Sequence, residues 1–189
     1  MQNKPYRLYQ AAAFKLRGLL MVPPIAFLLF WTRWEWEYEA GVWGIGLALF
    51  LPGVALRVWS QRYLRYRLRD GKGLATAGPY AWTRNPVYLG NLLMFAGLCV
   101  ICELPWVMPF VVGWAALVYH AAVRFEEDRL TKRYGATYVA YCHRVPRWVP
   151  CIAVEASLPV PSASLWRAAT VEWQCLLLAI VAVAKECWH

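Results

Sequence analysis

The sequence predicts an all-α, polytopic integral membrane protein with four to five transmembrane helices in a single domain, residues 1–189. Sixty per cent of the residues are apolar, well above the ~45–50% that is typical of soluble domains. The twelve Trp and eleven Tyr side chains suit the membrane–water interfaces. Long apolar runs also alternate with short charged segments, as expected of a chain that crosses a bilayer several times.

Four apolar runs are assigned to membrane crossings, each of which takes roughly 17–25 helical residues. They cover about residues 18–32, 40–56, 86–102 and 104–123. Pro23 and Pro24 predict a bend in the first run. Only Glu103 and a Leu-Pro step separate the third run from the fourth, so these two should form a tight antiparallel hairpin. A fifth run, residues 171–184, could span the membrane or lie in the interface, and we expect it to span.

Charged residues alternate in sign along the chain. Basic residues precede the first run, where Lys15 and Arg17 should snorkel to the interface, and they recur around residues 57–84 and after residue 123. Acidic residues dominate between the first and second runs. Lys and Arg favour cytoplasmic loops, so we expect the N-terminus and active site on the cytoplasmic side, of the inner membrane in a bacterium. The net charge of +9 then indicates membrane lipids, and not nucleic acid, as partners.

The six cysteines give no indication of a metal centre or a disulfide framework. Cys99 and Cys102 form a CxxC pair, but this pair lies inside an apolar run and has neither a second pair nor a His at ligand spacing. We therefore expect lipid-facing or helix-facing thiols and no metal site.

The first long polar segment ends in Gly78-Pro79-Tyr80 and then Arg84-Asn85-Pro86. Asn is a favoured helix N-cap and Pro is favoured at the first helical position, so the third apolar helix should begin here. Free backbone N–H groups at such a helix start can bind a carboxylate or a phosphate. In the alternative interpretation, Asn85 and Pro86 only begin the helix and Arg84 only anchors it to lipid headgroups.

The second polar segment follows the fourth apolar run. One face of the helix predicted there carries, at spacings of three or four residues, Glu127, Leu130, Tyr134, Tyr138 and Tyr141. Gly135 lies within this helix and could interrupt it. Glu126 and Glu127 are adjacent, so their side chains point in different directions. The alternative interpretation is a solvated helix in which Asp128 and Lys132 form an i,i+4 ion pair.

Taken together and in this order, these segments resemble the isoprenylcysteine carboxyl methyltransferases and the related bacterial and phospholipid N-methyltransferases. The resemblance covers about residues 40–150. The matching residues are Gly78, Pro79, Tyr80, Arg84, Pro86, Tyr88, Gly90, Glu126, Glu127, Leu130, Tyr134, Gly135, Tyr138, Tyr141, Val145, Pro146 and Arg147. One position departs, because Asn85 stands where the family usually has His. Asn cannot take up a proton near neutral pH, so a mechanism that depends on an imidazole at this position is in doubt. Asn can still form hydrogen bonds, so a binding role for this position is kept.

The resemblance implies methyl transfer from S-adenosylmethionine (SAM) to a membrane-embedded lipid or isoprenyl-type acceptor at the cytoplasmic membrane face. It implies that Arg84 and Glu127 are catalytic, within a cytoplasmic helix and the loop before the hairpin. The cofactor-binding residues it implies are Gly78, Tyr80, Asn85, Pro86, Tyr88, Leu89, Glu126, Glu127, Tyr134 and Tyr138. Arg144 and Arg147 are then expected to bind the acceptor.

Two other functions stay open at this point. Sterol reductases, which use NADPH, look similar around the Gly-Pro-Tyr and Arg-His-Pro-like stretch, although they are usually longer. The second open function is a non-catalytic membrane subunit. The Asn85 departure favours this function, whereas the intact Glu126-Glu127 pair argues against it. A transporter is disfavoured, because no charged residue lies deep in the second to fourth runs. The residues do not distinguish a carboxylate acceptor from an amine acceptor.

Overall fold

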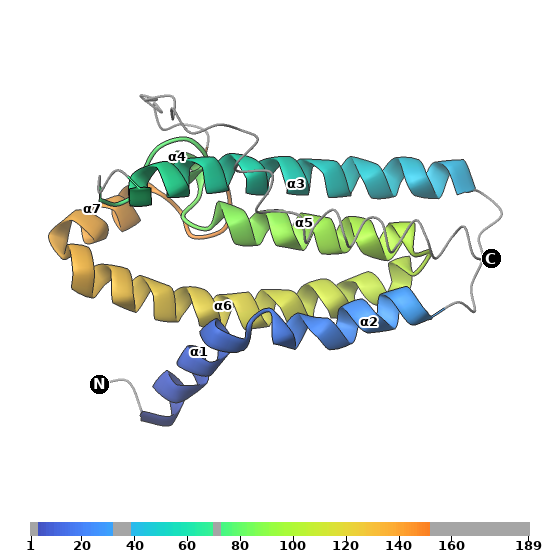
Figure 1. The fold of residues 1–189 in the computed structure, drawn as a ribbon, viewed down its shortest axis with the longest axis horizontal. Helices are drawn as coiled ribbons and strands as arrows, with labels where there is room; N and C mark the ends of the chain where they lie inside the picture. The colour runs from blue at the N-terminus through green and yellow to red at the C-terminus, as the bar shows by residue number, and fades with distance from the viewer. Residues whose placement is uncertain (1–3, 32–38, 70–72, 152–189) are drawn as a thin grey trace.

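The computed structural model describes residues 4–31, 39–69 and 73–151, and all regular secondary structure in these ranges is helical. The elements in chain order are α1 (Lys4–Leu16), η1 (Leu19–Met21), α2 (Val22–Phe30), α3 (Glu39–Arg69), α4 (Pro79–Trp82), α5 (Pro86–Ile101), η2 (Pro105–Val107), α6 (Met108–Tyr134) and α7 (Ala136–Arg144). Helices α2, α3, α5 and α6 run along the long axis, and α4 and α7 lie at one end (Figure 1). The all-α prediction is therefore confirmed for these ranges, and the predicted fifth run lies outside them.

Two of the described helical stretches, residues 40–64 and 105–134, are long and apolar enough to cross a membrane. The stretches Leu8–Leu16 and Leu19–Leu28 make a third span if the bent pair is counted as one. Helix α5 is apolar but has only 16 residues, slightly fewer than the roughly 17–25 that a crossing takes. The structure thus supports a membrane protein with two or three spans by length, and the predicted number of four to five stays a prediction.

The first apolar run is bent, but not at its prolines. The axes of the stretches before and after Arg17-Gly18 differ by 74°. Pro23 and Pro24 instead lie in the first turn of α2, where a helix does not need the missing N–H group. Arg17 Nη1 donates a hydrogen bond of 2.7 Å to the Phe14 carbonyl, in the last turn of α1. The predicted bend was therefore correct in kind and wrong in position.

Helix α3 extends well beyond the apolar run that predicted it. The run ends at Leu56, whereas the helix continues to Arg69. Residues 57–69 contain neither Gly nor Pro and include several Arg and Leu, which are good helix formers. The hydropathy pattern therefore marked where the apolar side chains end and not where the backbone hydrogen bonding ends.

Helices α3 and α5 approach closely through paired glycines. Gly46 faces Gly97, and Gly53 faces Gly90, with a spacing of seven residues on both helices. A Cβ atom on Gly97 would lie 2.7 Å from the Gly46 carbonyl oxygen, and one on Gly53 would lie 2.7 Å from that of Gly90. Small residues of this kind let helix backbones pack directly in a membrane, where there is no hydrophobic drive between helices.

The predicted hairpin between α5 and α6 is present. The backbone N–H of Leu104 donates to the Cys99 carbonyl, and that of Glu103 to the Val100 carbonyl, both at 2.9 Å. Glu103 has a φ of 59° and so turns the chain through the left-handed region. Cys99 and Cys102 are buried in the core at this turn. The hairpin therefore brings the N-terminus of α5 and the C-terminal half of α6 to the same end of the molecule (Figure 1).

Candidate functional site

Residues 145–151, here called the closing segment, bind along the loop that precedes α5. The Arg84 N–H donates to the Pro146 carbonyl, and the Cys151 N–H donates to the Trp82 carbonyl, each at 2.9 Å. The Thr83 hydroxyl adds a hydrogen bond of 3.0 Å to the Arg147 carbonyl. The two segments that carry the Arg-Asn-Pro and Val-Pro-Arg motifs are therefore joined, although more than 60 residues separate them in the chain.

Gly78 and Tyr80 begin this end of the molecule. Gly78 has a φ of 63°, and a Cβ atom there would lie 2.6 Å from the ring of Tyr63, so the position requires glycine on both counts. Tyr80 is buried, and its carbonyl accepts a hydrogen bond of 2.7 Å from the Tyr141 hydroxyl. Burial raises the pKa of both tyrosines above the ordinary value, so both are neutral at physiological pH.

Asn85 precedes the first residue of α5, as predicted, but its side chain does not cap the helix. It donates a hydrogen bond of 3.1 Å to the Arg147 carbonyl instead. The first-turn N–H groups of α5 therefore gain no partner from the Asn85 side chain. In this structure Asn85 links α5 to the closing segment and also lines the cavity described below.

Glu127 lies between two arginines. Its Oε1 atom is 2.9 Å from Arg84 Nη1 and 3.0 Å from Arg147 Nε, and its Oε2 atom is 2.6 Å from Arg147 Nη2. The Glu127 side chain is only 14% exposed. These hydrogen bonds raise the pKa of Arg147 further above its ordinary value. We call this group the Arg84–Glu127–Arg147 clamp, because it ties α6 to both motif segments.

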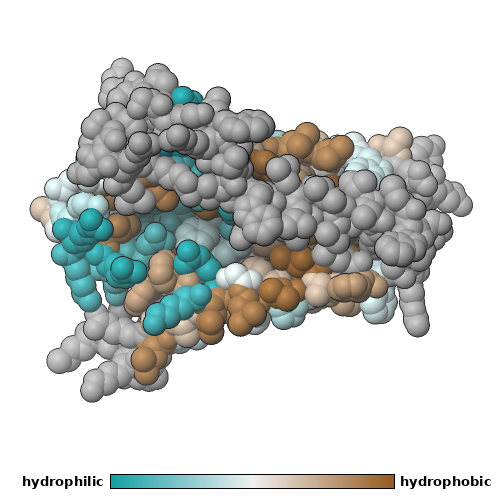
Figure 2. All heavy atoms as spheres, viewed as in Figure 1, coloured by the Kyte–Doolittle hydropathy of each residue, from teal (hydrophilic) through white to brown (hydrophobic). Residues whose placement is uncertain are grey.

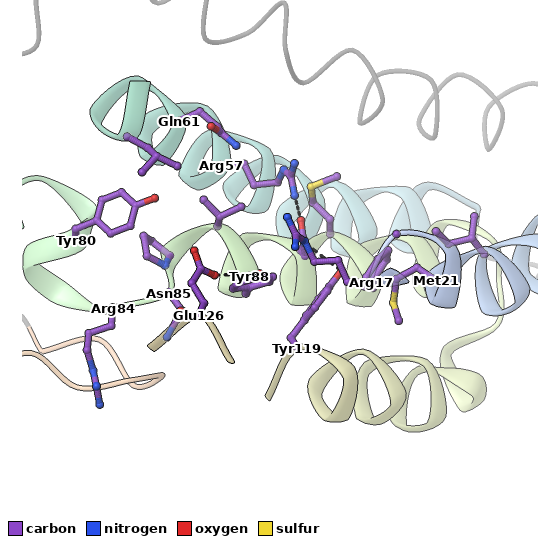
Figure 3. A pocket seen from close by; sticks show the side chains of 18 residues that line it. Arg17, Met21, Arg57, Gln61, Tyr80, Arg84, Asn85, Tyr88, Tyr119 and Glu126 are labelled. Atoms are coloured by element: carbon purple, nitrogen blue, oxygen red, sulfur yellow. Dashed lines mark hydrogen bonds between the residues drawn. The ribbon is translucent and has the colours of Figure 1, made fainter. Parts of the chain in front are cut away.

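A cavity of about 450 Å³ adjoins the loop that precedes α5. It is formed by the bend between α1 and α2, by α3, by the start of α5 and by α6 (Figure 3). Met21, Ile25, Met94 and Phe95 line an apolar part of it, and the remaining lining is largely polar or aromatic. A volume of this size is within the ~300–1,000 Å³ of small-molecule sites.

Glu126, not Glu127, lines the cavity. Its Oε2 atom accepts a hydrogen bond of 3.4 Å from the Tyr88 hydroxyl, and the Tyr80 hydroxyl points towards the same space (Figure 3). Arg84 also borders the cavity, but its guanidinium points away from the cavity (Figure 3) and pairs with Glu127. The two adjacent glutamates thus have different surroundings, as their position on a helix required.

A second group of polar side chains in the cavity was not among the predicted site residues. Arg57 Nη1 donates to Asn91 Oδ1, and Asn91 Nδ2 is 3.1 Å from the Tyr119 hydroxyl (Figure 3). Arg17, which was predicted to snorkel to the interface, lies at the bend after α1 and lines the same cavity. Hydropathy and motif spacing could not identify this group, because its members come from three separate helices and the bend after α1.

The predicted site residues therefore divide into two sets. Those that line the cavity are Tyr80, Arg84, Asn85, Pro86, Tyr88 and Glu126. Those that do not are Gly78, Leu89, Glu127, Tyr134, Tyr138, Arg144 and Arg147. Gly135 interrupts the predicted helix with a φ of 53°, and Tyr138 and Tyr141 then pack with Val145 in a small separate core. Arg144 is exposed, and its guanidinium bonds to the Ala140 carbonyl within its own helix.

A polar end and an apolar body are visible on the molecular surface. On the face in Figure 2, hydrophilic side chains gather at the end that carries α7, and hydrophobic ones cover much of the remaining described surface. The cavity lies where these two regions meet, since Asn85 and Glu126 line it together with Met94 and Phe95. A ligand there could contact polar and apolar groups together.

Comparison with known proteins identifies the class to which this site belongs. A family model described as phospholipid methyltransferase matches residues 42–137, half of the chain. The match includes α5, most of α3 and all of α6, and therefore the helices that surround most of the cavity. The chain belongs to this family of membrane proteins, as the motifs had indicated.

The individual relatives differ in what their names describe. The chain is 30% identical to the cobalt-zinc-cadmium resistance protein CzcN of Cupriavidus metallidurans over 87% of its own length and 77% of that protein. It is 26% identical to the nickel-cobalt-cadmium resistance protein NccN of Alcaligenes xylosoxydans xylosoxydans, over 75% and 65% respectively. It is also 33% identical to the Delta(14)-sterol reductase LBR of Gallus gallus, but over only 40% of the chain and 12% of the reductase.

No solved structure matches the chain significantly. Because two relatives are named for metal resistance, potential metal ligands in the described ranges are relevant. Within residues 4–31, 39–69 and 73–151, no three His, Cys, Asp or Glu side chains are grouped so that they could hold a metal ion.

Proposed function

We propose that the protein transfers a methyl group from SAM to a lipid or isoprenyl-type acceptor that reaches the cavity from the membrane. Family membership supports methyltransferase chemistry. The observation that carries the proposal is the cavity itself, in which the polar side chains of both motif segments meet apolar side chains of the membrane helices.

The residues in the cavity fit the chemical groups of the cofactor. SAM contains a cationic sulfonium, an amino acid tail with an ammonium and a carboxylate, a ribose and an adenine. Glu126 can bind a cation or sugar hydroxyls, and the rings of Tyr80 and Tyr88 can pack against a heterocycle. The first turn of α5, beside Asn85, can bind a carboxylate through backbone N–H groups.

When bound, SAM supplies an electrophilic methyl group that is transferred by in-line displacement. The contribution of the chain's own residues is then alignment and exclusion of water. For an amine acceptor, Glu126 is the carboxylate in the cavity that can accept the proton. For a carboxylate acceptor no base is needed. Asn85 cannot serve as a base in either case.

We further propose different roles for the two glutamates and the two arginines of the motifs. Glu126 contacts the ligand, whereas Glu127, Arg84 and Arg147 hold the loop before α5 and the closing segment in place. Both oxygens of Glu127 are already bonded to guanidinium groups, which supports this division. Binding of the acceptor by Arg144 is not supported by its exposed position on α7.

Membrane orientation is part of the proposal. The N-terminus, α4, α7 and the closing segment are proposed to lie at the cytoplasmic face, where SAM is available, with α5 as an additional crossing beside α3, α6 and the bent first pair. The charge alternation along the sequence and the glycine pairing between α3 and α5 support this arrangement.

Calorimetric titration of the detergent-purified protein with SAM tests the function. We expect saturable binding that Glu126→Gln weakens at least tenfold while the protein stays folded. Arg124→Gln is the matched control on the same helix, since Arg124 does not line the cavity. A folded protein that does not bind SAM contradicts the proposal.

A second candidate is a sterol-type membrane reductase, favoured by the 33% identity to the chicken reductase. NADPH is therefore titrated in parallel. Binding of NADPH without SAM supports the reductase, and binding of neither supports a non-catalytic membrane subunit.

A further inference from the structure

A second hollow, here called the α1–α6 groove, adjoins the cavity and has a volume of about 500 Å³. Its lining residues are Phe14, Glu126, Arg129, Leu130, Lys132 and Arg133. Glu126 also lines the cavity, so the two hollows meet at this side chain. Arg129, Lys132 and Arg133 are exposed, so the groove is a polar approach to the cavity from the water side.

Phe14 lies where the groove meets the cavity. Its ring centroid is 5.4 Å from that of Phe125 on α6. The guanidinium of Arg17, which lines the cavity, is 4.4 Å from the Phe14 centroid. The guanidinium of Arg129, which lines the groove, is 5.8 Å from the same centroid. The Phe14 ring thus has a neighbour from each hollow, through contacts that are individually weak.

The chain is held differently on the two sides of the bend after α1. Trp114 Nε1 donates a hydrogen bond of 2.9 Å to the Leu20 carbonyl, which ties the segment after the bend to α6. Before the bend, α1 packs on α6 through the Phe14 and Phe125 rings. At the bend itself, a Cβ atom on Gly18 would have no neighbour within 4 Å. A hinge at Gly18 can therefore move α1 while α2 stays in place.

Gln10 makes the closed position of α1 costly. It lies one helical turn before Phe14, and it is only 1% exposed. Within the described ranges, neither the oxygen nor the nitrogen of its side-chain amide has a hydrogen-bond partner. A buried amide of this kind has lost its hydrogen bonds to water, and it regains them when the helix moves away. The packing of α1 on α6 is therefore offset by a penalty that opening removes.

We propose that α1 is a lid, and that a water-soluble ligand enters the cavity through the α1–α6 groove when Phe14 swings aside. Helix α1 precedes residues 42–137, which the family model matches, so the lid lies outside the matched part of the chain. That the entering ligand is the cofactor rests on the proposed function, whereas the lid itself does not.

Labelling of a cysteine inside the cavity measures opening without any cofactor. The reporter is Met94→Cys in a chain whose six native cysteines are replaced by Ala, because Met94 lines the cavity and is 4% exposed. The probe is a charged, water-soluble methanethiosulfonate, whose reaction in detergent is followed by mass spectrometry. Phe14→Ala should raise the labelling rate at least tenfold. Leu8→Ala is the matched control and should not change the rate, since Leu8 is exposed on α1 and lines neither hollow.

Gln10→Leu distinguishes a moving lid from a hole left by the missing Phe14 ring. Gln10 lines neither hollow, so its substitution changes the rate only through the position of α1. Leu is of similar size and buries no polar atom, so it should favour the closed lid and lower the labelling rate at least fivefold. An unchanged or higher rate in this variant contradicts the lid, and so do equal rates for Phe14→Ala and Leu8→Ala. If Phe14→Ala unfolds, Gln10→Leu still decides the question.

Stopped-flow binding of SAM to the same variants separates this inference from the proposed function. Gln10→Leu should slow the association of SAM at least fivefold, and Leu8→Ala should not. Labelling that follows the lid, in a protein that binds no SAM, overturns the methyltransferase proposal and leaves the lid. SAM association and cysteine labelling that are both as fast in Gln10→Leu as in the unsubstituted chain overturn the lid and leave the methyltransferase proposal.

Discussion

At the scale of single residues, Glu126 and Glu127 show how neighbours in sequence come to have different contacts. Glu127 is bonded through both oxygens to Arg84 and Arg147, whereas Glu126 lines the cavity with one hydrogen bond to Tyr88. Successive residues of a helix point about 100° apart, so Glu126 faces the cavity and Glu127 faces the two arginines.

Glu127→Gln should lower the free energy of unfolding by about 2 kcal/mol, because hydrogen bonds to charged groups contribute ~1.5–3 kcal/mol and two guanidiniums lose their counter-charge. Glu126→Gln should change stability little and reduce ligand binding. Thermal unfolding in detergent measures both variants. Equal destabilisation by the two substitutions contradicts the distinct roles.

Gly78 gives a second residue-scale prediction. Gly78→Ala should destabilise the protein more than Gly73→Ala, since both glycines have a positive φ but only Gly78 would place its Cβ against Tyr63. Each should cost about 1 kcal/mol for the backbone conformation, and Gly78→Ala a further ~1–3 kcal/mol for the overlap. Similar melting temperatures for the two variants would show that the Tyr63 ring yields.

Three buried tyrosines predict how stability depends on pH. Burial raises the pKa of Tyr80, Tyr138 and Tyr141 above the ordinary value of ~10. In the unfolded chain they ionise near pH 10, and in the folded protein they keep their protons. Stability should therefore be unaffected by these groups below about pH 9 and fall as the pH rises above ~10. Absorbance titration of tyrosinate, with Tyr141→Phe for comparison, measures this, and ionisation of all tyrosines near pH 10 in folded protein is the contrary result.

At the scale of elements, the α3–α5 contact depends on four glycines. Gly97→Ala should lower stability by about 1–3 kcal/mol, because its Cβ would lie 2.7 Å from a backbone oxygen of α3. Gly44→Ala is the control, since nothing lies within 4 Å of a Cβ there. Thermal unfolding of both variants in detergent tests the contact. A neutral Gly97→Ala would mean that the helices can separate at little cost.

Element boundaries were predictable where local chemistry fixes them. Asn85-Pro86 identified the start of α5, and the short Glu103 turn identified the hairpin. The end of α3 was not predictable from hydropathy, because Arg57 ended the apolar run without ending the helix. Local pattern also could not predict that Arg17 and Arg57 would share a cavity, since that depends on how three helices pack. The heptad spacing of glycines on the second and third apolar runs was an available signal of their contact.

At the scale of the whole molecule, one end brings together the loop before α5, the closing segment and Glu127 of α6. Helix α7, the loop before α5 and the closing segment lie at that end (Figure 1), and Arg84 and Asn85 of the loop line the cavity (Figure 3). If that end faces the cytoplasm, a soluble cofactor and a membrane-resident acceptor can reach the cavity from opposite directions.

Labelling of Cys151 tests this orientation. Cys151 is exposed in the closing segment, whereas Cys99 and Cys102 are buried. A variant that keeps only Cys151, with the other five cysteines replaced by Ala, should react with a membrane-impermeant maleimide in inside-out vesicles and not in right-side-out vesicles. The reverse pattern would place the cavity on the opposite face of the membrane.

The clamp has a consequence for biosynthesis. Ribosomes deliver the chain from its N-terminus, so Arg84 and Glu127 emerge before Arg147 can pair with them. The helical hairpin can therefore enter the membrane before the clamp is complete, because the clamp needs Arg147 of the closing segment. A nascent chain arrested at Arg144 carries every described helix and yet lacks the partner of Thr83 and Asn85. An unfinished chain of this length therefore lacks the clamp that we propose holds the loop before α5 in place.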